Sequence, residues 1–251
     1  MEDGTAEFHI GRNDSTYANG LMKNVAVWSR ALTATEIKDV MYKTYDELNS
    51  TLRTNLSRWY SLEDGTGSTA VDSTGTQNGT VSGSQGWKTT IYGDNAPMKP
   101  RLVDTAPRDE DSPPDFGEVY SGRALIFDGV SDYFTIGQPS KLNFGSGDHS
   151  YSVWVNSATW EAEDTIVSRY ADGNNRMLLQ WHTGSPNKLV FYIEKSSSIK
   201  YNVRCAWTPV NGRWYHIAVT LDNGTAVKLY IDGESQTLTD NTVTSGDTDI
   251  A

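Results

Sequence analysis

The sequence predicts an all-β protein, an antiparallel two-sheet jelly-roll sandwich with one short helix. Two observations support this fold class: apolar and polar residues alternate over most of the chain, and clusters of Gly, Asp and Asn separate the alternating segments. A chain of 251 residues is long enough to bury a large core as a single sandwich. Its single cysteine, Cys205, excludes a disulfide scaffold.

Period-two alternation marks the individual strands. Tyr151, Val153 and Val155 fall on one face of a predicted strand. The neighbouring Trp154 falls on the opposite face. The same alternation recurs in three further segments, at 189–193, 215–221 and 227–231. The dipeptide Asn223-Gly224 lies between the last two, and it supplies the positive φ angles that a tight hairpin requires. Many short strands joined by such turns are typical of a sandwich or jelly roll.

The helix is predicted near the beginning of the chain. Thr33 and Glu36 have the spacing of a capping box, in which each side chain bonds the backbone N–H of the other residue. An apolar stripe follows, formed by Ile37, Val40 and Met41. We expect the helix to run to about Leu48, with its polar side facing solvent.

The segment 93–117 differs in composition from the rest of the chain. It contains five prolines and the acidic run Asp109-Glu110-Asp111, which predicts a long surface loop, extended where proline fixes the backbone. A binding loop and a passive insertion are both compatible with this composition.

The charge of the chain limits its partners. The formal net charge is −11 and the pI is about 4.7, which argues against nucleic acid and anionic membrane surfaces. An acidic surface suits calcium, because calcium prefers oxygen ligands. The sequence has no transmembrane run and no pattern of a signal peptide, so we expect no membrane insertion.

Several segments together resemble the laminin-G-like jelly roll of the concanavalin A-like lectin/glucanase superfamily. They are WYSLEDGTGSTAVDSTGTQNGT (59–80), ALIFDGVSDYFTIG (124–137), YSVWVN (151–156), RWYHIAVTLDNGTAVKLYIDG (213–233), FHIGRND (8–14) and GLMKNVAVWSRALTATEI (20–37). The resemblance implies a concanavalin A-like sandwich. It says less about function, because this fold hosts lectins, enzyme accessory modules, adhesion modules and structural caps.

The order of these segments departs from the family pattern. Residues 1–48 resemble the C-terminal strands and helix of such a domain, whereas 49–251 resemble its main body, including the proline-rich loop. Three interpretations follow: a circular permutation in which 1–48 close their own domain, a fragment of tandem repeats, or donation of these strands to a neighbouring copy or domain.

A calcium site is the first candidate for chemistry. Asp72 and Asn78 lie in one Gly-rich turn, and Asp128 and Asp132 lie in another. Carboxylate, amide and backbone oxygens are the ligands that calcium takes, and the resemblance implies that the two turns can meet around a structural ion. The alternative is that these side chains bond only their own turns.

A carbohydrate platform is the second candidate. Four tryptophans lie within strand patterns and are predicted to be core: Trp28, Trp59, Trp154 and Trp214. Sugars bind to exposed aromatic faces beside polar side chains that fix their hydroxyl groups. We therefore predict a groove from loop and strand-end residues, namely Trp160, Tyr170, Asp172, Asn174 and Trp181. The alternative is ordinary packing at the sheet rims.

The sequence predicts no catalytic site. Glucanases that the chain resembles carry two carboxylates one strand period apart, and no Glu-x-Asp-x-x-Glu or similar motif occurs in this sequence. Glu161 and Glu163 lie in a predicted loop, and His216 follows the alternation of its strand, which favours a structural role. Cys205 has little in its sequence surroundings that would lower the thiol pKa.

These observations predict a non-catalytic module that binds carbohydrate or a protein surface and is stabilised by calcium. The alternative function is a structural or assembly module of a larger multidomain or virion protein, such as a phage tail or capsid surface. Either function would place the chain outside cells or on a virion surface.

Overall fold

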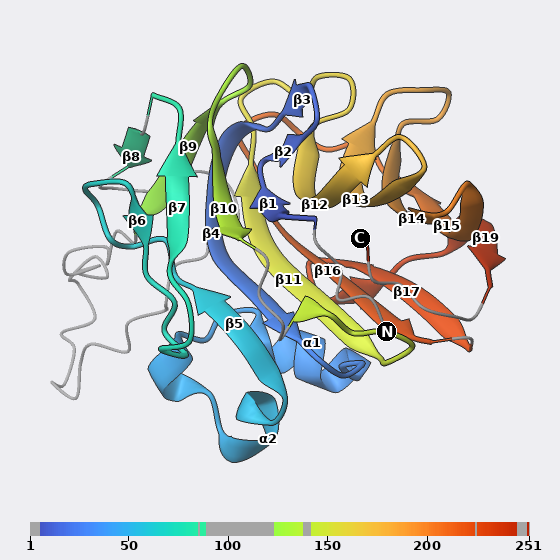
Figure 1. Cartoon of the computed structure of the whole chain (residues 1–251), viewed down its shortest axis with the longest axis horizontal. Helices are drawn as coiled ribbons and strands as arrows, with labels where there is room; N and C mark the ends of the chain where they lie inside the picture. Colours follow the sequence, from blue (N-terminus) through green and yellow to red (C-terminus); the bar gives the residue numbers. More distant parts are fainter. Residues whose placement is uncertain are drawn as a thin grey trace, which may run out of the picture.

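The computed structural model describes residues 6–84, 86–88, 123–137, 142–223, 225–244 and 250, and it contains two large antiparallel sheets packed face to face (Figure 1). The predicted all-β sandwich with concanavalin A-like architecture is confirmed. The proline-rich segment 93–117 lies outside the described residues.

The first sheet has nine strands. In spatial order they are β19 (Leu238–Val243), β15 (Ser198–Ala206), β14 (Lys188–Lys195), β13 (Asn175–His182), β12 (Thr165–Asp172), β1 (Phe8–Ile10), β10 (Tyr133–Gly137), β7 (Gly79–Ser82) and β6 (Thr69–Ala70). A small hairpin of β2 (Arg12–Asn13) and β3 (Thr16–Tyr17) forms a sheet of its own.

The second sheet has eight strands, and seven of them follow one another in space. They are β18 (Glu234–Ser235), β17 (Ala226–Ile231), β16 (Trp214–Asp222), β11 (His149–Asn156), β4 (Asn19–Trp28), β9 (Ala124–Asp128) and β8 (Gly86–Lys88). The eighth strand, β5 (Leu56–Tyr60), also pairs with β4.

The main hydrophobic core fills the space between the two sheets. The predicted inward faces are confirmed: Tyr151, Val153 and Val155 lie in this core. Trp154 is buried on the other side of its strand. The inward residues of 189–193, 215–221 and 227–231 follow the same alternation. The four tryptophans predicted from strand patterns are all buried, namely Trp28, Trp59, Trp154 and Trp214.

The beginning of the chain supplies an interior strand to each sheet. β1 lies between β10 and β12, with Phe8 opposite Arg169. β4 lies between β11 on one side and β9 and β5 on the other. The Ala6 N–H donates to the Ile250 carbonyl at 3.4 Å, which brings the two ends of the described chain together. That the order arose by circular permutation, or that another copy can supply these strands, stays a prediction.

The predicted helix begins where expected but ends earlier. Helix α1 spans Ala34–Val40, and the capping box of Thr33 and Glu36 is present. The expected extension to Leu48 is wrong, because a second capping box at Thr44 and Glu47 starts a separate 3-10 turn, Tyr45–Glu47. A further short helix, α2, spans Ser50–Arg53.

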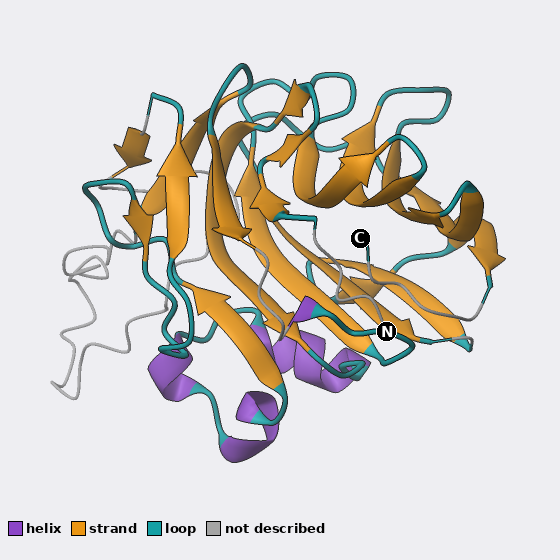
Figure 2. Cartoon of the chain, in the orientation of Figure 1, coloured by secondary structure: helices purple, strands orange, loops and turns teal. Residues whose placement is uncertain are grey.

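These helical segments form a second core on the outer face of the eight-stranded sheet. Figure 2 shows the helices gathered on one side of the sandwich. Trp28 of β4 donates its indole N–H to the Leu52 carbonyl of α2 at 2.7 Å. The ring of Trp28 meets that of Trp59 at a centroid distance of 6.3 Å in an edge-on arrangement. The outer face of this sheet is therefore covered by helices where α1 and α2 pack on β4 and its neighbours.

Gly20 lies where the backbones of β4 and β11 approach each other closely. It has φ +140°, and a Cβ atom there would lie 2.0 Å from the Asn156 carbonyl oxygen. We expect Gly20→Ala to lower the free energy of unfolding by about 3 kcal/mol, because it adds a clash to a strained φ. Urea unfolding measures this loss.

Gly67→Ala is the matched control. Gly67 also has a positive φ, +78°, but a Cβ atom there would meet nothing within 4 Å. This control should cost about 1 kcal/mol, the strain of the backbone alone. Equal losses for the two variants would contradict the close approach at Gly20.

Candidate functional site

The two tryptophans predicted for a sugar groove pack in or against the main core. Trp181 is only 3% exposed and is part of the main core. Trp160 is partly buried, with its ring centroid 5.9 Å from that of Trp181 and 5.2 Å from that of Trp207. The prediction failed because Trp181 shares the inward alternation of Met177 and Leu179, although it lies near the end of its strand. Trp181 is therefore not available as a platform, and Trp160 is only partly exposed.

The polar residues predicted for the same groove lie elsewhere. Tyr170 pairs with Arg176 at one end of the β12–β13 hairpin, whereas Trp181 lies near its other end. Asp172 and Asn174 are exposed in the connecting turn, where the Asn174 N–H donates to the Asp172 carboxylate at 2.7 Å. The five residues therefore do not form one groove.

Asp72 organises its own turn. Its carboxylate accepts hydrogen bonds from the backbone N–H groups of Trp59, Thr74 and Gln77 at 3.0–3.1 Å. Burial alone would raise the pKa of Asp72, but these bonds hold it below its ordinary value. Arg58 lies 3.8 Å away, and both charged groups are buried. The Asp72 oxygens thus face N–H donors and a guanidinium, which is an unsuitable surrounding for a cation.

The second predicted turn is also self-contained. Asp128 accepts the N–H groups of Val130, Ser131 and Asp132 at 2.7–2.9 Å. Burial opposes the change, but the bonds lower the pKa of Asp128 to about 2. The buried Asp132 accepts the Ser84 N–H at 2.5 Å.

The two turns lie at opposite ends of β7. Asn78 accepts the Asp72 N–H just before β7, whereas Asp132 accepts the Ser84 N–H just beyond it. The predicted shared calcium site is therefore not formed by these four residues. Within the described part of the chain, no group of three His, Cys, Asp or Glu residues is arranged to hold a metal ion. Stabilisation by calcium stays a prediction without a site.

The variant Asp72→Asn tests whether Asp72 binds a metal ion or only stabilises its own turn. We expect the variant to lose about 3 kcal/mol of unfolding free energy, because it leaves the buried Arg58 without its counter-charge. The loss should be the same in calcium and in EDTA, as measured by urea unfolding in both buffers. A loss that appears only with calcium present would show that Asp72 binds the ion.

The outer face of the nine-stranded sheet carries a groove of about 610 Å³. Its floor lies over β13, β14 and β15, where the outward side chains alternate with those of the core. The outward residues include the apolar side chains Leu178, Val190, Tyr192 and Ile199. They also include the polar side chains Arg176, Gln180, His182, Lys188, Asn202 and Arg204, and Glu163 and Asn13 contribute from neighbouring segments.

A cluster of Arg176, Tyr192 and Glu194 lies at one end of this groove. Arg176 Nη2 lies 3.1 Å from Glu194 Oε2, and the Tyr192 hydroxyl donates to the same oxygen at 2.9 Å. The Arg176 guanidinium lies 5.2 Å from the centroid of the Tyr192 ring. Burial and the bond to Glu194 raise the pKa of the Tyr192 phenol. The three side chains therefore fix one another, with Tyr192 neutral at physiological pH.

Further polar pairs line the rest of the groove. Arg204 Nε donates to the Asn202 side-chain oxygen at 2.9 Å and lies 4.0 Å from the Asp240 carboxylate. His182 Nε2 lies 3.4 Å from Glu163 Oε1. The groove thus offers hydrogen-bond donors and acceptors in close pairs, above an apolar floor.

A serine–histidine pair lies in the opposite sheet. Ser152 Oγ and His216 Nε2 are 2.8 Å apart, and both residues are buried. Burial lowers the pKa of His216 to about 3, so the imidazole is neutral. The pair lies next to Trp154, whose indole N–H donates to the Met41 carbonyl at 2.7 Å after helix α1. A substrate has no access to it, and the structural role expected for His216 agrees with this burial.

The sequence analysis did not predict the groove residues, because apolar alternation identifies only the side chains that face the core. The inward residues Leu189, Phe191 and Ile193 identify β14 as a strand. The intervening Val190 and Tyr192 must then face outward, beside polar residues of β13 and β15. The outward positions can be read from the same alternation. Their polar residues, however, look the same in a ligand groove and on an ordinary solvated face.

Comparison with known families agrees with the fold. Residues 128–250 match the family model described as the concanavalin A-like lectin/glucanases superfamily. This segment is similar to concanavalin A-like domains. The match covers β10 to β19, whereas β1 and β4, which lie inside the two sheets, come from residues before it. No curated protein and no solved structure matched the chain.

The match to this superfamily supports a lectin-like or adhesion-type module as the general class of the protein. Its groove lies within the matched segment, apart from the contribution of Asn13. Among the helices of the described residues, none has the length and apolar character needed to cross a membrane.

Proposed function

We propose that this concanavalin A-like domain is a non-catalytic carbohydrate-binding module, and that the glycan lies in the groove over β13, β14 and β15. The observation that supports this most is the combination of an apolar floor with paired polar side chains on one open sheet face. The outer face of the other sheet carries the helical layer instead.

The chemistry of the groove suits a sugar. Sugar rings have apolar C–H faces, which can pack on Leu178, Val190 and the ring of Tyr192. Their hydroxyl groups both donate and accept hydrogen bonds. Arg204 with Asn202 supplies a donor beside an acceptor, and Arg176 with Glu194 does the same.

The charge balance favours hydroxyl groups over a polyanion. Three basic side chains face the groove: Arg176, Lys188 and Arg204. Three carboxylates accompany them: Glu163, Glu194 and Asp240. Fixed charges of opposite sign in equal number do not attract a highly charged ligand over distance. A neutral glycan is therefore the ligand class we expect, with a protein surface as the alternative partner. Glycans of this kind would place the module outside cells.

A glycan array probed with the multimerised protein tests the proposal, because multivalency makes weak single sites visible. We expect binding to a defined sugar class, and we expect Tyr192→Ala and Arg204→Ala each to weaken it by about tenfold, the effect of losing one well-placed contact. Lys228→Ala is the control, because Lys228 is exposed on β17 of the other sheet.

Urea unfolding of the variants shows whether a loss of binding comes from a lost contact or from unfolding. The two groove variants should unfold at nearly the same urea concentration as the unaltered protein, since both side chains are only partly buried. The absence of glycan binding by folded protein would contradict a lectin. Binding that survives both groove substitutions would show that the glycan lies elsewhere.

A further inference from the structure

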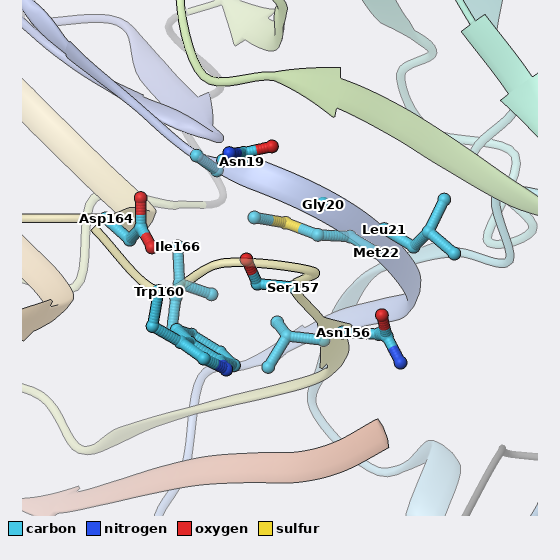
Figure 3. A pocket seen from close by; sticks show the side chains of 11 residues that line it. Asn19, Gly20, Leu21, Met22, Asn156, Ser157, Trp160, Asp164 and Ile166 are labelled. Carbon is cyan, nitrogen blue, oxygen red and sulfur yellow. The ribbon is translucent and has the colours of Figure 1, made fainter. Parts of the chain in front are cut away.

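One loop closes the end of the sandwich next to the groove. It connects β11, which ends at Asn156, to β12, which begins at Thr165. Figure 3 shows Trp160 and Asp164 of this loop beside Met22 and Asn19 of β4. Together with the ends of β11 and β12, these residues enclose a small cavity of about 10 Å³, close to the volume that one water molecule needs.

Asp164 places a carboxyl group at this cavity without a cation to balance it. The residue is 4% exposed. Its side chain accepts a single hydrogen bond within the described residues, from the Glu161 N–H at 2.9 Å. The other lining residues, at 18–22, 155–157, 160 and 166, are all uncharged. An ionised carboxylate here would lose its hydration and gain little in return.

The charged groups that surround Asp164 do not favour its ionised form. Glu161 on the same loop is negative and exposed, and Glu163 is also exposed. The segments of β4, β11 and β12 that line the cavity contribute no titratable side chain. On β13, His182 lies next to Trp181 and pairs with Glu163. Burial raises the pKa of Asp164 to about 7; the Glu161 N–H opposes this change, and the Glu161 carboxylate adds to it.

The loop is held by hydrogen bonds at its two ends and by ring packing between them. The Ser157 carbonyl accepts the Gly212 N–H at 2.7 Å, and the Asn19 side chain donates to the Thr159 hydroxyl at 3.1 Å. Ala158, Thr159 and the segment 161–163 are exposed, so Trp160 and Asp164 are its inward-facing side chains after Ser157. Trp160 packs on Trp207 and Tyr215 at centroid distances of 5.2 and 6.4 Å, yet its buried indole N–H has no hydrogen-bond partner among the residues that the structure describes. A neutral Asp164 therefore adds to the ring packing and hydrogen bonds that hold the closed loop.

The same loop reaches the groove. Asp164 accepts the Trp181 N–H on its backbone carbonyl at 3.0 Å, which ties the loop to β13. The preceding residue, Glu163, lines the groove and lies 3.4 Å from His182. Movement of Asp164 out of the cavity would therefore displace Glu163 from the groove.

We propose that Asp164 is a protonation-controlled latch: its neutral form keeps the loop 157–164 closed and Glu163 in the groove, and its ionised form opens the loop. The second half of this statement, regulation of ligand binding, rests on the proposed function of the groove. The first half, opening of the loop, does not depend on any ligand.

The direction of the pH effect follows from the protonation state. A carboxyl group that is held neutral in the folded protein stabilises the closed loop fully below its ordinary pKa of about 4. This stabilisation is lost as the pH rises toward 7, the folded pKa of Asp164. We therefore expect the loop to open more often at pH 8 than at pH 5.5.

Hydrogen exchange of the Glu161 and Trp181 amides tests the latch, because both N–H groups bond to Asp164. After correction for the intrinsic pH dependence of exchange, both amides should exchange about tenfold faster at pH 8 than at pH 5.5, as expected for a local opening. Asp164→Asn, which keeps the shape of the neutral group, should remove this difference. Asp222→Asn, at an exposed position at the far end of β16, should retain it.

Two results would overturn the latch: equal corrected exchange at both pH values in the unaltered protein, or an unchanged pH difference in Asp164→Asn. If that variant does not fold, the carboxyl carbon of Asp164 can be titrated by NMR in the unaltered protein. A midpoint near pH 7 that coincides with faster exchange supports the latch, and a midpoint near pH 4 overturns it.

Binding of the glycan found on the array tests the link to the groove. We expect about tenfold weaker binding at pH 8 than at pH 5.5 in the unaltered protein, and equal binding at both in Asp164→Asn. Opening of the loop without a change in affinity would overturn the link alone. Silence of the array at every pH would contradict the proposed function and leave the exchange result unaffected.

Discussion

The position of β4 inside the eight-stranded sheet is the constraint on which the remaining structure depends. Its ten residues pair with β11 along one edge and with β9 and β5 along the other. The inward side chains Met22, Val25 and Val27 belong to the main core. The outward side chains Ala26 and Trp28 belong to the core beneath the helices. One strand near the beginning of the chain therefore joins both layers of apolar packing.

This placement also determines which sheet face remains open. The chain leaves β4 at Trp28 and enters α1 within six residues, so the helices must pack on the outer face of the same sheet. The outer face of the nine-stranded sheet keeps its groove over β13 to β15. The proposed binding surface and the proposed latch both lie in or next to this groove, where the loop 157–164 passes from one sheet to the other.

The sequence was sufficient for the strands and insufficient for the site, for a physical reason. Alternation reports which side chains face the core, and it predicted the inward faces of β11, β14, β16 and β17 correctly. It cannot tell whether an aromatic ring near a strand end is covered. Trp160 is covered because Trp207 and Tyr215 meet it from distant parts of the chain. Asp72 was predicted to bind a metal ion from its Gly-rich turn. In the structure its oxygens accept N–H groups that only the folded turn brings together.

We propose the open face of the nine-stranded sheet as the binding surface of this domain. Chemical-shift mapping by NMR during titration with a bound glycan tests it most directly. We expect the largest shifts of backbone amides on β13, β14 and β15, around Arg176, Tyr192 and Arg204. Shifts confined to the turn at Asp172, or to the helical layer on the other sheet, would contradict it.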